Sequence, residues 1–222
     1  MKVLIVLAHP EPQSFNAAMY RTAVQAVEAA GHEVKVSDLN QQAFYAVSDR
    51  SNFKSAKDAQ FLKLQLEETY ATSTRTFSPG LEAEIQKVEW CDLMIWQFPL
   101  WWFGLPAILK GWVDRVFAMG RAYGDGHVYE HGLFRGKKAL LSLTTGGGVA
   151  DYESTGLNGD MQGILRPIHR GILEFTGFEV LQPQLVYGPA RLTEEERRRE
   201  LDNWTSRLQQ ITTETAIQVG MY

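Results

Sequence analysis

The stretch KVLIVLAHPEPQSFNAAMYRTAVQAVEAAGHEVKVSD, residues 2–38, contains the signals that decide the fold. Its first run, Lys2–Leu7, is continuously aliphatic, which is typical of a strand buried on both faces of a parallel sheet. Residues 14–30 are rich in alanine and stop before Gly31, a residue that often ends a helix, and Glu33–Asp38 predicts a second strand. A strand, a helix and a strand in this order form a right-handed βαβ unit, so we expect a parallel sheet.

The alternation of helices and strands continues along the chain. Further strands are predicted at residues 92–98, 138–144 and 179–187, and helices at 81–90, 106–117, 160–175 and after Thr193, which opens a Thr-x-x-Glu capping box. Residues 61–70 are expected to contribute to a helix and residues 69–80 to form a loop. Five strands alternating with helices predict an open, doubly wound α/β sheet in a single domain over residues 1–222.

Composition excludes several classes of protein. Apolar residues make up 45% of the 222 residues, which is enough for a full core and argues against a disordered chain. Lys and Arg number 22 against 26 Asp and Glu, so the net charge of −4 offers no basic face for nucleic acid. The single cysteine, Cys91, cannot form an intrachain disulfide, which suits a reducing compartment such as the cytoplasm.

One apolar stretch requires comparison with membrane helices. Residues 93–109 carry no charge over 17 residues and are rich in Trp and Phe. A membrane helix needs about 20 apolar residues, whereas this run is interrupted by Pro99, Gly104 and Pro106. We interpret it as a buried strand, a loop and the start of a helix, and we expect a soluble protein without membrane insertion.

Three loops follow predicted strands at the carboxyl edge of the sheet, where ligands of open α/β folds bind. The first loop contains His9, Ser14 and Asn16 and leads into a helix N-terminus, which suits a phosphate group. The alternative is that Ser14 only caps the helix and that His9 is a structural turn residue.

The second loop, residues 100–104, reads LWWFG, and its flat side chains suit a planar aromatic ligand, the alternative being a core aromatic cluster. The third, residues 144–148, reads TTGGG and offers backbone amides that can stabilise negative charge, the alternative being a flexible turn. A phosphate end, an aromatic slot and an amide-rich turn around one crevice together indicate a flavin site. No Gly-x-Gly-x-x-Gly follows the first strand, which disfavours a Rossmann nicotinamide domain.

Five longer segments are distinctive when taken together: LIVLAHPEPQSFN (4–16), QFPLWWFGLPAILKGWVDRVF (97–117), FRGKKALLSLTTGGG (134–148), GDMQGILRPI (159–168) and GFEVLQPQLVYG (177–188). They resemble the NAD(P)H:quinone oxidoreductases of the DT-diaphorase type. The resemblance runs from Val3 to about Leu208 and is weakest between residues 40 and 76. It implies a flavodoxin-like fold, a cytoplasmic homodimer and non-covalent FAD, with hydride taken from NAD(P)H and passed as two electrons to a quinone.

The resemblance also implies roles for individual residues. The phosphate, ribityl and distal parts of FAD would be held by His9, Ser14, Phe15, Asn16, Gln65 and Arg197. The flavin ring would lie along Pro99, Leu100, Trp101, Trp102 and Phe103, and its pyrimidine edge would bond to Thr144, Thr145, Gly146 and Gly147. Tyr152 would act near the flavin O2 as a catalytic residue. The substrate pocket would be walled from the partner subunit by Tyr123 and Phe175, with Asp125 beside them.

The chain departs from the mammalian members at several positions. Asn158 stands six residues after Tyr152, where those enzymes carry a histidine that joins the tyrosine in stabilising the reduced flavin. Asparagine can hydrogen-bond but cannot become cationic, so Tyr152 and the amide-rich turn would carry that role. Asp125 replaces a second pocket tyrosine. The chain also stops near Tyr222, without the extension that helps hold the nucleotide, so the choice between NADH and NADPH stays open.

No metal site is expected. Some relatives carry one on the helix before Phe175, where this chain has Arg170 and Glu174. The segment 127–131 formally matches His-x-x-Glu-His, but the glycines on both sides disfavour the helix that this motif requires.

Three other functions are weighed against quinone reduction. RAYGDG, residues 121–126, also resembles ancillary flavoproteins of glutathione-gated potassium efflux systems, which bind and activate a membrane transporter. An FMN-bound azo or nitro reductase would use similar chemistry, with FMN as the less favoured cofactor. A flavodoxin-like electron carrier is disfavoured because such carriers are usually strongly acidic, whereas the net charge is −4.

Overall fold

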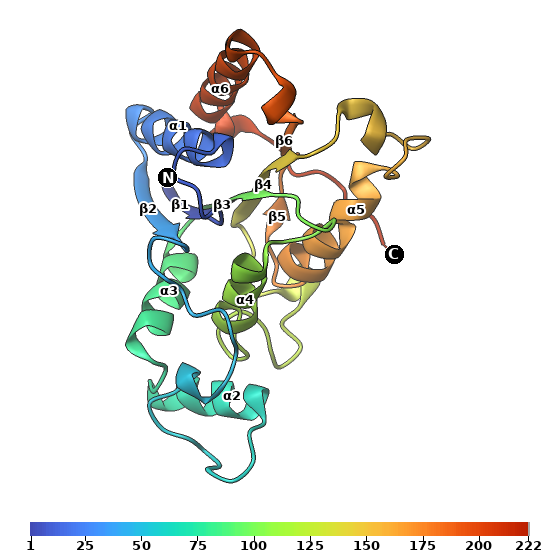
Figure 1. Ribbon diagram of the computed structural model, residues 1–222. Helices are drawn as coiled ribbons and strands as arrows, with labels where there is room; N and C mark the ends of the chain where they lie inside the picture. Colours follow the sequence, from blue (N-terminus) through green and yellow to red (C-terminus); the bar gives the residue numbers. More distant parts are fainter. Residues whose placement is uncertain (222) are drawn as a thin grey trace.

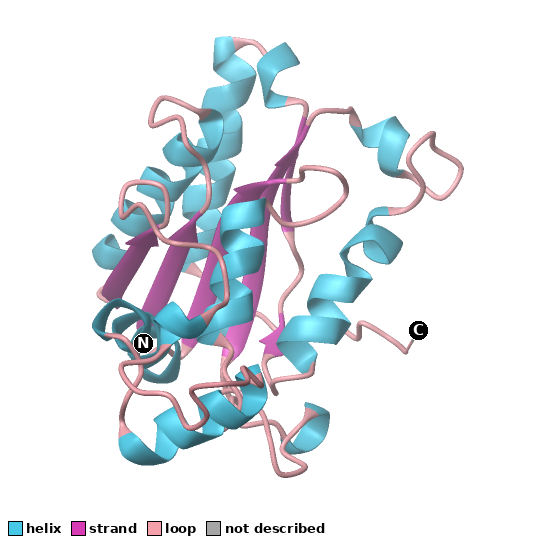
Figure 2. Cartoon of the chain, turned by 60° about the horizontal axis from the view of Figure 1, so that its bottom comes forward, coloured by secondary structure: helices cyan, strands magenta, loops and turns pink. Residues whose placement is uncertain are grey.

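Residues 1–221 are described by the computed structural model, and a six-stranded parallel sheet lies at their centre (Figures 1 and 2). The strand order is β2-β1-β3-β4-β5, with β6 also paired to β4. The strands are β1 (Lys2–Leu7), β2 (Glu33–Asp38), β3 (Leu93–Pro99), β4 (Lys138–Thr145), β5 (Glu179–Val180) and β6 (Gln184–Tyr187). The first two have the predicted bounds, and the order reverses between β1 and β3, which is where a ligand is expected in such a sheet.

The edge strand predicted over residues 179–187 is broken in two. β5 pairs with the start of β4 through Lys138, and β6 pairs with its end through Ser142 to Thr145. Pro183 lies in the gap and has no N–H to donate to the ladder, which accounts for the interruption. The prediction of one continuous strand was wrong, although both pieces lie beside β4 in parallel, as expected of a fifth strand.

Helices cover both faces of the sheet (Figure 2). They are α1 (Phe15–Ala29), α2 (Leu64–Thr74), α3 (Pro79–Trp90), α4 (Ala107–Val116), α5 (Met161–Ile168) and α6 (Glu194–Gln209). Helices α1 and α6 pack on one face, and α3, α4 and α5 on the other, whereas α2 lies away from the sheet (Figure 1). Single 3-10 turns occur at Arg50–Asn52, Tyr129–His131, Val149–Tyr152, Pro189–Arg191 and Ile211–Thr213.

Two helical segments differ from their predictions. Helix α2 begins only at Leu64, because Asp58 accepts backbone bonds from Gln60 and Phe61 and holds that segment in a loop. It then continues to Thr74, inside the stretch predicted as loop. The helix predicted over 160–175 is capped by Asp160, but after Ile168 it widens into a π-helical turn, His169–Glu174, which follows Pro167. Proline removes one helical hydrogen bond, so a change of winding there is expected.

Each face of the sheet has its own apolar core. Val3, Ile5 and Leu140 pack beneath α1 and α6, and Trp96 and Trp112 lie in the larger core on the other face. Cys91 is fully buried, and burial raises the pKa of its thiol to about 12, which confirms it as a small buried hydrophobe. Among residues 1–221, no helix combines the length and apolar character needed to cross a bilayer.

Candidate functional site

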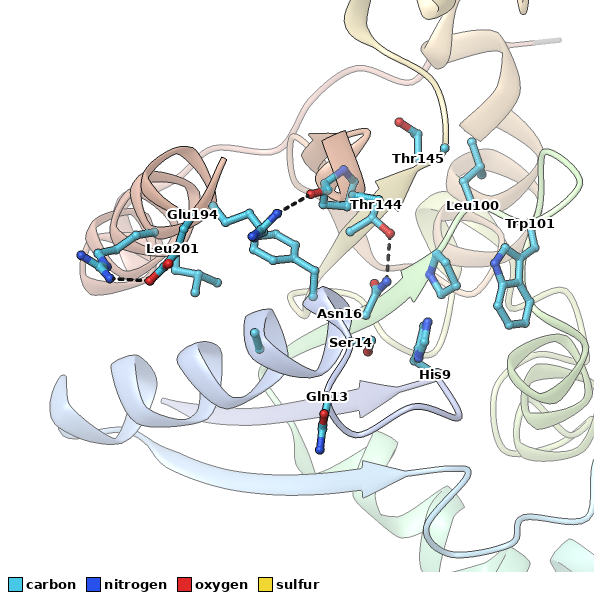
Figure 3. Close-up of a pocket in the computed structure, with 18 of the residues that line it drawn as sticks. His9, Gln13, Ser14, Asn16, Leu100, Trp101, Thr144, Thr145, Glu194 and Leu201 are labelled. Atoms are coloured by element: carbon cyan, nitrogen blue, oxygen red, sulfur yellow. Dashed lines mark hydrogen bonds and ion pairs between the residues drawn. The ribbon is translucent and has the colours of Figure 1, made fainter. Parts of the chain in front are cut away.

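A cavity of about 920 Å³ opens at the carboxyl edge of the sheet, between α1, α6 and the loops after β3 and β4 (Figure 3). Of the predicted cofactor residues, it is lined by His9, Ser14, Phe15, Asn16, Pro99, Leu100, Trp101, Trp102, Thr144, Thr145, Gly146 and Arg197. Parallel strands therefore bring the three predicted loops to one place, as the sheet type requires.

The α1 side of the cavity is built on a helix cap. Ser14 Oγ accepts the Ala17 amide at 3.1 Å, so the capping interpretation of Ser14 is confirmed, and the same residue also lines the cavity. His9 Nδ1 accepts the Glu11 amide at 3.1 Å, which makes His9 a turn residue as well. Its ring lies 6.0 Å from the Trp101 ring, so the first two loops meet here.

The aromatic loop after β3 faces outward. Trp101, Trp102 and Phe103 are 45%, 98% and 51% exposed, so the alternative of a core aromatic cluster is wrong. Trp102 and Phe103 both have positive φ, 50° and 57°, a conformation that costs a bulky residue of order 1–3 kcal/mol. Exposed aromatic rings on strained backbone are typical of ligand clamps.

The loop after β4 is tied down by side chains. Thr145 Oγ1 donates to the Gly147 carbonyl at 2.8 Å, and Arg191 Nη2 donates to the Gly146 carbonyl at 2.6 Å. Gly146 borders open space, whereas a Cβ on Gly147 would lie 2.6 Å from Asp151 Oδ2 and 3.0 Å from the Tyr152 ring. The turn is therefore held by side-chain hydrogen bonds at Gly146 and Gly147.

Tyr152 and Asn158 lie just beyond this loop. The Tyr152 ring is buried and lies 5.8 Å from the Tyr187 ring. Burial of Tyr187, and to a smaller extent the nearby Tyr152, raises the pKa of Tyr187. Asn158 is half-buried, and its backbone N–H donates to the Asp151 backbone carbonyl at 2.8 Å. Neither residue is among those lining the cavity, although Tyr152 touches the glycine turn that does.

The remaining predicted residues form a second group elsewhere in the chain. Gln65 Nε2 donates to Tyr123 Oη at 3.2 Å, and the Tyr123 and Phe175 rings are 5.7 Å apart beside a pocket of about 210 Å³. Glu68, which sequence reasoning missed, also borders this pocket, and burial raises the pKa of its carboxyl. Asp125 is exposed in a left-handed turn with φ 50°.

Helix α6 supplies the wall that sequence reasoning largely missed. Arg197 Nη1 donates to the Leu192 carbonyl at 2.5 Å, and Arg198 pairs with Glu194 at 3.1 Å (Figure 3). The overlooked lining residues are Gln13, Ala18, Pro189, Ala190, Glu194, Arg198 and Leu201. The capping box at Thr193 and Glu196 is confirmed and could have marked this helix end as one that faces the site.

No metal donor set is found near these residues. His127 Nδ1 lies 3.1 Å from the Gly124 carbonyl, and Glu130 and His131 lie in a single 3-10 turn that does not place both histidines on one helix face. Within residues 1–221, no three His, Cys, Asp or Glu side chains are grouped so that they could hold a metal ion.

Comparison with known proteins identifies the family. A family model described as a flavodoxin-like fold matches residues 1–209. The chain is 45% identical to NAD(P)H dehydrogenase [quinone] 1 of Cavia porcellus over 217 residues, covering 97% of this chain and 79% of that protein. The chain belongs to the flavodoxin-like NAD(P)H:quinone oxidoreductase family.

Other members of this family are similar over nearly their whole length. Human ribosyldihydronicotinamide dehydrogenase [quinone] is 42% identical and is covered to 94%, with 97% of this chain aligned. A solved structure from Klebsiella pneumoniae, described as a quinone reductase, has a TM-score of 0.94 at 39% identity, covering 98% of this chain and 87% of that one.

A more distant relative bears on the regulatory alternative. The ancillary protein KefF of a glutathione-regulated potassium-efflux system, from an Enterobacter species, is 35% identical over 108 residues. That match covers 48% of this chain and 57% of the relative, far less than the quinone oxidoreductases do.

Proposed function

We propose that this chain is a flavin-dependent NAD(P)H:quinone oxidoreductase. The observation that carries the proposal is the cavity at the carboxyl edge of the sheet, where an exposed aromatic loop, a glycine turn and a buried polar floor surround one space. Family membership supports the same reaction. A planar redox ring suits the aromatic wall, and the Asn16 and Thr144 side chains suit its polar substituents or the chain attached to it.

We propose FAD rather than FMN as the flavin of this cavity. A volume of about 920 Å³ lies at the upper end of ordinary ligand pockets, which span about 300–1,000 Å³. The cavity extends from the cap of α1 to the first turns of α6, where Arg197 supplies positive charge and Arg198 is paired with Glu194. An FMN phosphate would be served by the α1 end alone, so the α6 end fits a second phosphate and the adenosine of FAD.

The protein's own contribution is positioning and electrostatics. The bound flavin would supply the redox chemistry, taking hydride from NAD(P)H and passing it to a quinone in a ping-pong cycle. Trp101 and Trp102, which line the cavity, would exclude water from one side of the ring, whereas Phe103 lies next to them in the loop and does not line the cavity. Tyr152, buried against the turn at Gly147, would donate a hydrogen bond where negative charge develops, as donors in an oxyanion hole do. Asn158 remains neutral and cannot add a cationic proton donor.

We further propose a cytoplasmic homodimer in which the second group of residues completes the site. Tyr123 and Phe175 border a separate small pocket and Gln65 bonds to Tyr123, so these three residues would act on the cavity of a second subunit. The exposed Trp102 ring supports this, because a 98% exposed tryptophan is expected to be covered in an assembly.

The visible spectrum of the purified protein tests the reaction. We expect a yellow protein that releases FAD and is bleached by anaerobic NADH or NADPH in one two-electron step. A protein that neither takes up flavin nor oxidises NAD(P)H would contradict the proposal.

A pair of variants on α6 tests FAD against FMN. Arg197→Ala removes a cavity-lining cation, and Arg199→Ala removes one that pairs with Glu195 on the exposed helix face. We expect the first variant to weaken FAD binding several-fold and leave FMN binding unchanged, and the second to alter neither. Equal effects of both variants on FAD would contradict the assignment of the α6 end.

The partial match to KefF supports one second candidate, an ancillary role on a potassium-efflux system. In that case the flavoprotein would bind a membrane transporter and its reductase activity would be secondary. Co-purification with an efflux transporter from the same cell separates the two. A retained, flavin-independent complex would favour the ancillary role, and its absence together with quinone turnover would favour the reductase.

A further inference from the structure

A row of buried polar side chains lies directly beneath the cavity. On the α1 face of the sheet, the apolar residues Leu93 and Ile95 of β3 are followed by Gln97, which is only 1% exposed. Asn16 of α1 lies above it and bonds to Thr144 of β4, and both Asn16 and Thr144 line the cavity. Burying an amide without a partner is costly, so this departure from an apolar core requires an explanation.

The three side chains form a hydrogen-bonded relay. Gln97 Nε2 donates to Asn16 Oδ1 at 2.9 Å, and Asn16 Nδ2 donates to Thr144 Oγ1 at 2.9 Å (Figure 3 shows the second bond). A hydroxyl carries one proton and two lone pairs. Because Thr144 Oγ1 accepts from Asn16, its own proton is left to be donated, and no acceptor for it is found within residues 1–221.

The direction of the relay is set by Met19. An amide side chain can turn by 180° and exchange its donor and acceptor ends, which would reverse every bond in the relay. Met19 Sδ lies 3.7 Å from Gln97 Nε2 and can only accept a hydrogen bond. Turning Gln97 would place its carbonyl oxygen against that sulfur, with two lone-pair atoms in contact and no proton between them. Met19 is fully buried, and Gln97 Oε1 has no hydrogen-bond partner among the described residues, so the contact with Met19 is the interaction of Gln97 that distinguishes the two orientations.

We infer that Gln97 is a positioning residue that makes the Thr144 hydroxyl a hydrogen-bond donor into the cavity. The cavity therefore selects ligands that present an acceptor at that point, such as a carbonyl oxygen, an unprotonated ring nitrogen or a phosphate oxygen. The inference rests on the proposed flavin function, since a flavin carries all three kinds of acceptor. It explains why a glutamine that touches no ligand is buried in the sheet.

A double-mutant cycle on the flavin-free protein tests this coupling. Gln97→Met keeps the side-chain size but removes the donor, so Asn16 becomes free to turn and capture the Thr144 proton. Thr144→Val removes that proton directly. We expect each variant to weaken FAD binding about fivefold, the effect of losing one hydrogen bond. The double variant should bind no more weakly than Thr144→Val alone, because both changes remove the same bond.

The measurements are FAD dissociation constants from fluorescence titration, with the thermal midpoints of the flavin-free variants as a check on folding. Ser142→Ala is the matched control: Ser142 pairs in register with Gln97, is equally buried, and its Oγ has no hydrogen-bond partner among the described residues. We expect it to leave FAD binding within twofold of the unaltered chain. Loss of affinity equal to that of Gln97→Met would overturn the inference.

Three further outcomes are decisive. An additive cycle, with about 25-fold weaker binding in the double variant, would show that Gln97 acts through general packing and would overturn the relay. If Gln97→Met fails to fold, Met19→Leu takes its place in the cycle. Met19→Leu conserves side-chain volume and removes only the sulfur that sets the direction of the relay. If Met19→Leu leaves FAD binding unchanged, or if its effect adds to that of Thr144→Val, the inference is overturned. A flavin-free protein that binds no FAD at all would refute the proposed function itself.

Discussion

The glycine turn after β4 allows a prediction whose magnitude follows from local geometry. Gly146 and Gly147 are neighbours, and neither has the positive φ that would make alanine strained. A Cβ on Gly146 would meet no atom within 4 Å, whereas one on Gly147 would lie 2.6 Å from Asp151 Oδ2 and 3.0 Å from the Tyr152 ring. The two alanine variants therefore differ only in what the added methyl group contacts.

Alanine at position 147 must displace Asp151 or Tyr152. Asp151 Oδ2 accepts the Gly148 amide at 2.8 Å, and losing this bond costs about 1 kcal/mol. Shifting the buried Tyr152 ring adds an overpacking cost of about 1–3 kcal/mol. Gly147→Ala should therefore destabilise the fold by about 2–4 kcal/mol in total. In a chain of this length that lowers the Tm by roughly 4–16 °C.

Thermal unfolding of the two flavin-free variants, followed by circular dichroism, measures the difference. Gly146→Ala should stay within about 0.5 kcal/mol of the unaltered chain, as substitutions into open space usually do. Equal midpoints for Gly146→Ala and Gly147→Ala would refute the claim that the packing of Asp151 and Tyr152 fixes the shape of the turn.

Three further predictions follow from buried groups. Tyr152→Phe should slow anaerobic flavin reduction by NAD(P)H while flavin content stays normal, and unchanged stopped-flow rates would exclude its hydrogen-bonding role. Burial lowers the pKa of the His169 imidazole to about 4, so as the pH falls below 6.5 the imidazole becomes protonated in the unfolded chain before it does in the folded one. The folded state should therefore lose about 3 kcal/mol of its free energy of unfolding between pH 6.5 and 4. His169→Gln should flatten that pH dependence in thermal scans. Cys91 should resist alkylation at pH 8 in the native protein and react fully in denaturant, and rapid native labelling would contradict its burial.

Much of the fold follows from local patterns. Lys2–Leu7 is aliphatic throughout and Glu33–Asp38 is set off by turn residues, so both strands have the predicted bounds. The caps at Ser14 and Thr193 mark the starts of α1 and α6, because a side-chain oxygen placed before a helix satisfies amides only a few residues away. Since parallel strands end at one edge, three of the cavity's walls could also be placed from sequence alone.

Other features required the tertiary structure. The break at Pro183 and the π-helical turn after Ile168 depend on which neighbours satisfy the backbone, and residues 57–63 stay out of α2 because of bonds to Asp58 and Glu67. The sequence also did not determine whether Trp102 is buried or exposed, since an aromatic run in a loop can pack into a core or lie on the surface.

The sequence by itself therefore determined the sheet, its parallel direction and the chemistry of the loops at its carboxyl edge, because these depend on periodicity and on contacts within a few residues. Only the tertiary structure decided that α6 closes the cavity, that Gln65 and Tyr123 lie outside it, and that Met19 orients the relay from Gln97 to Thr144. The hydrogen bonds among these residues join positions 58 to 128 apart in the chain, and they form only when the packing of the whole domain brings distant segments together.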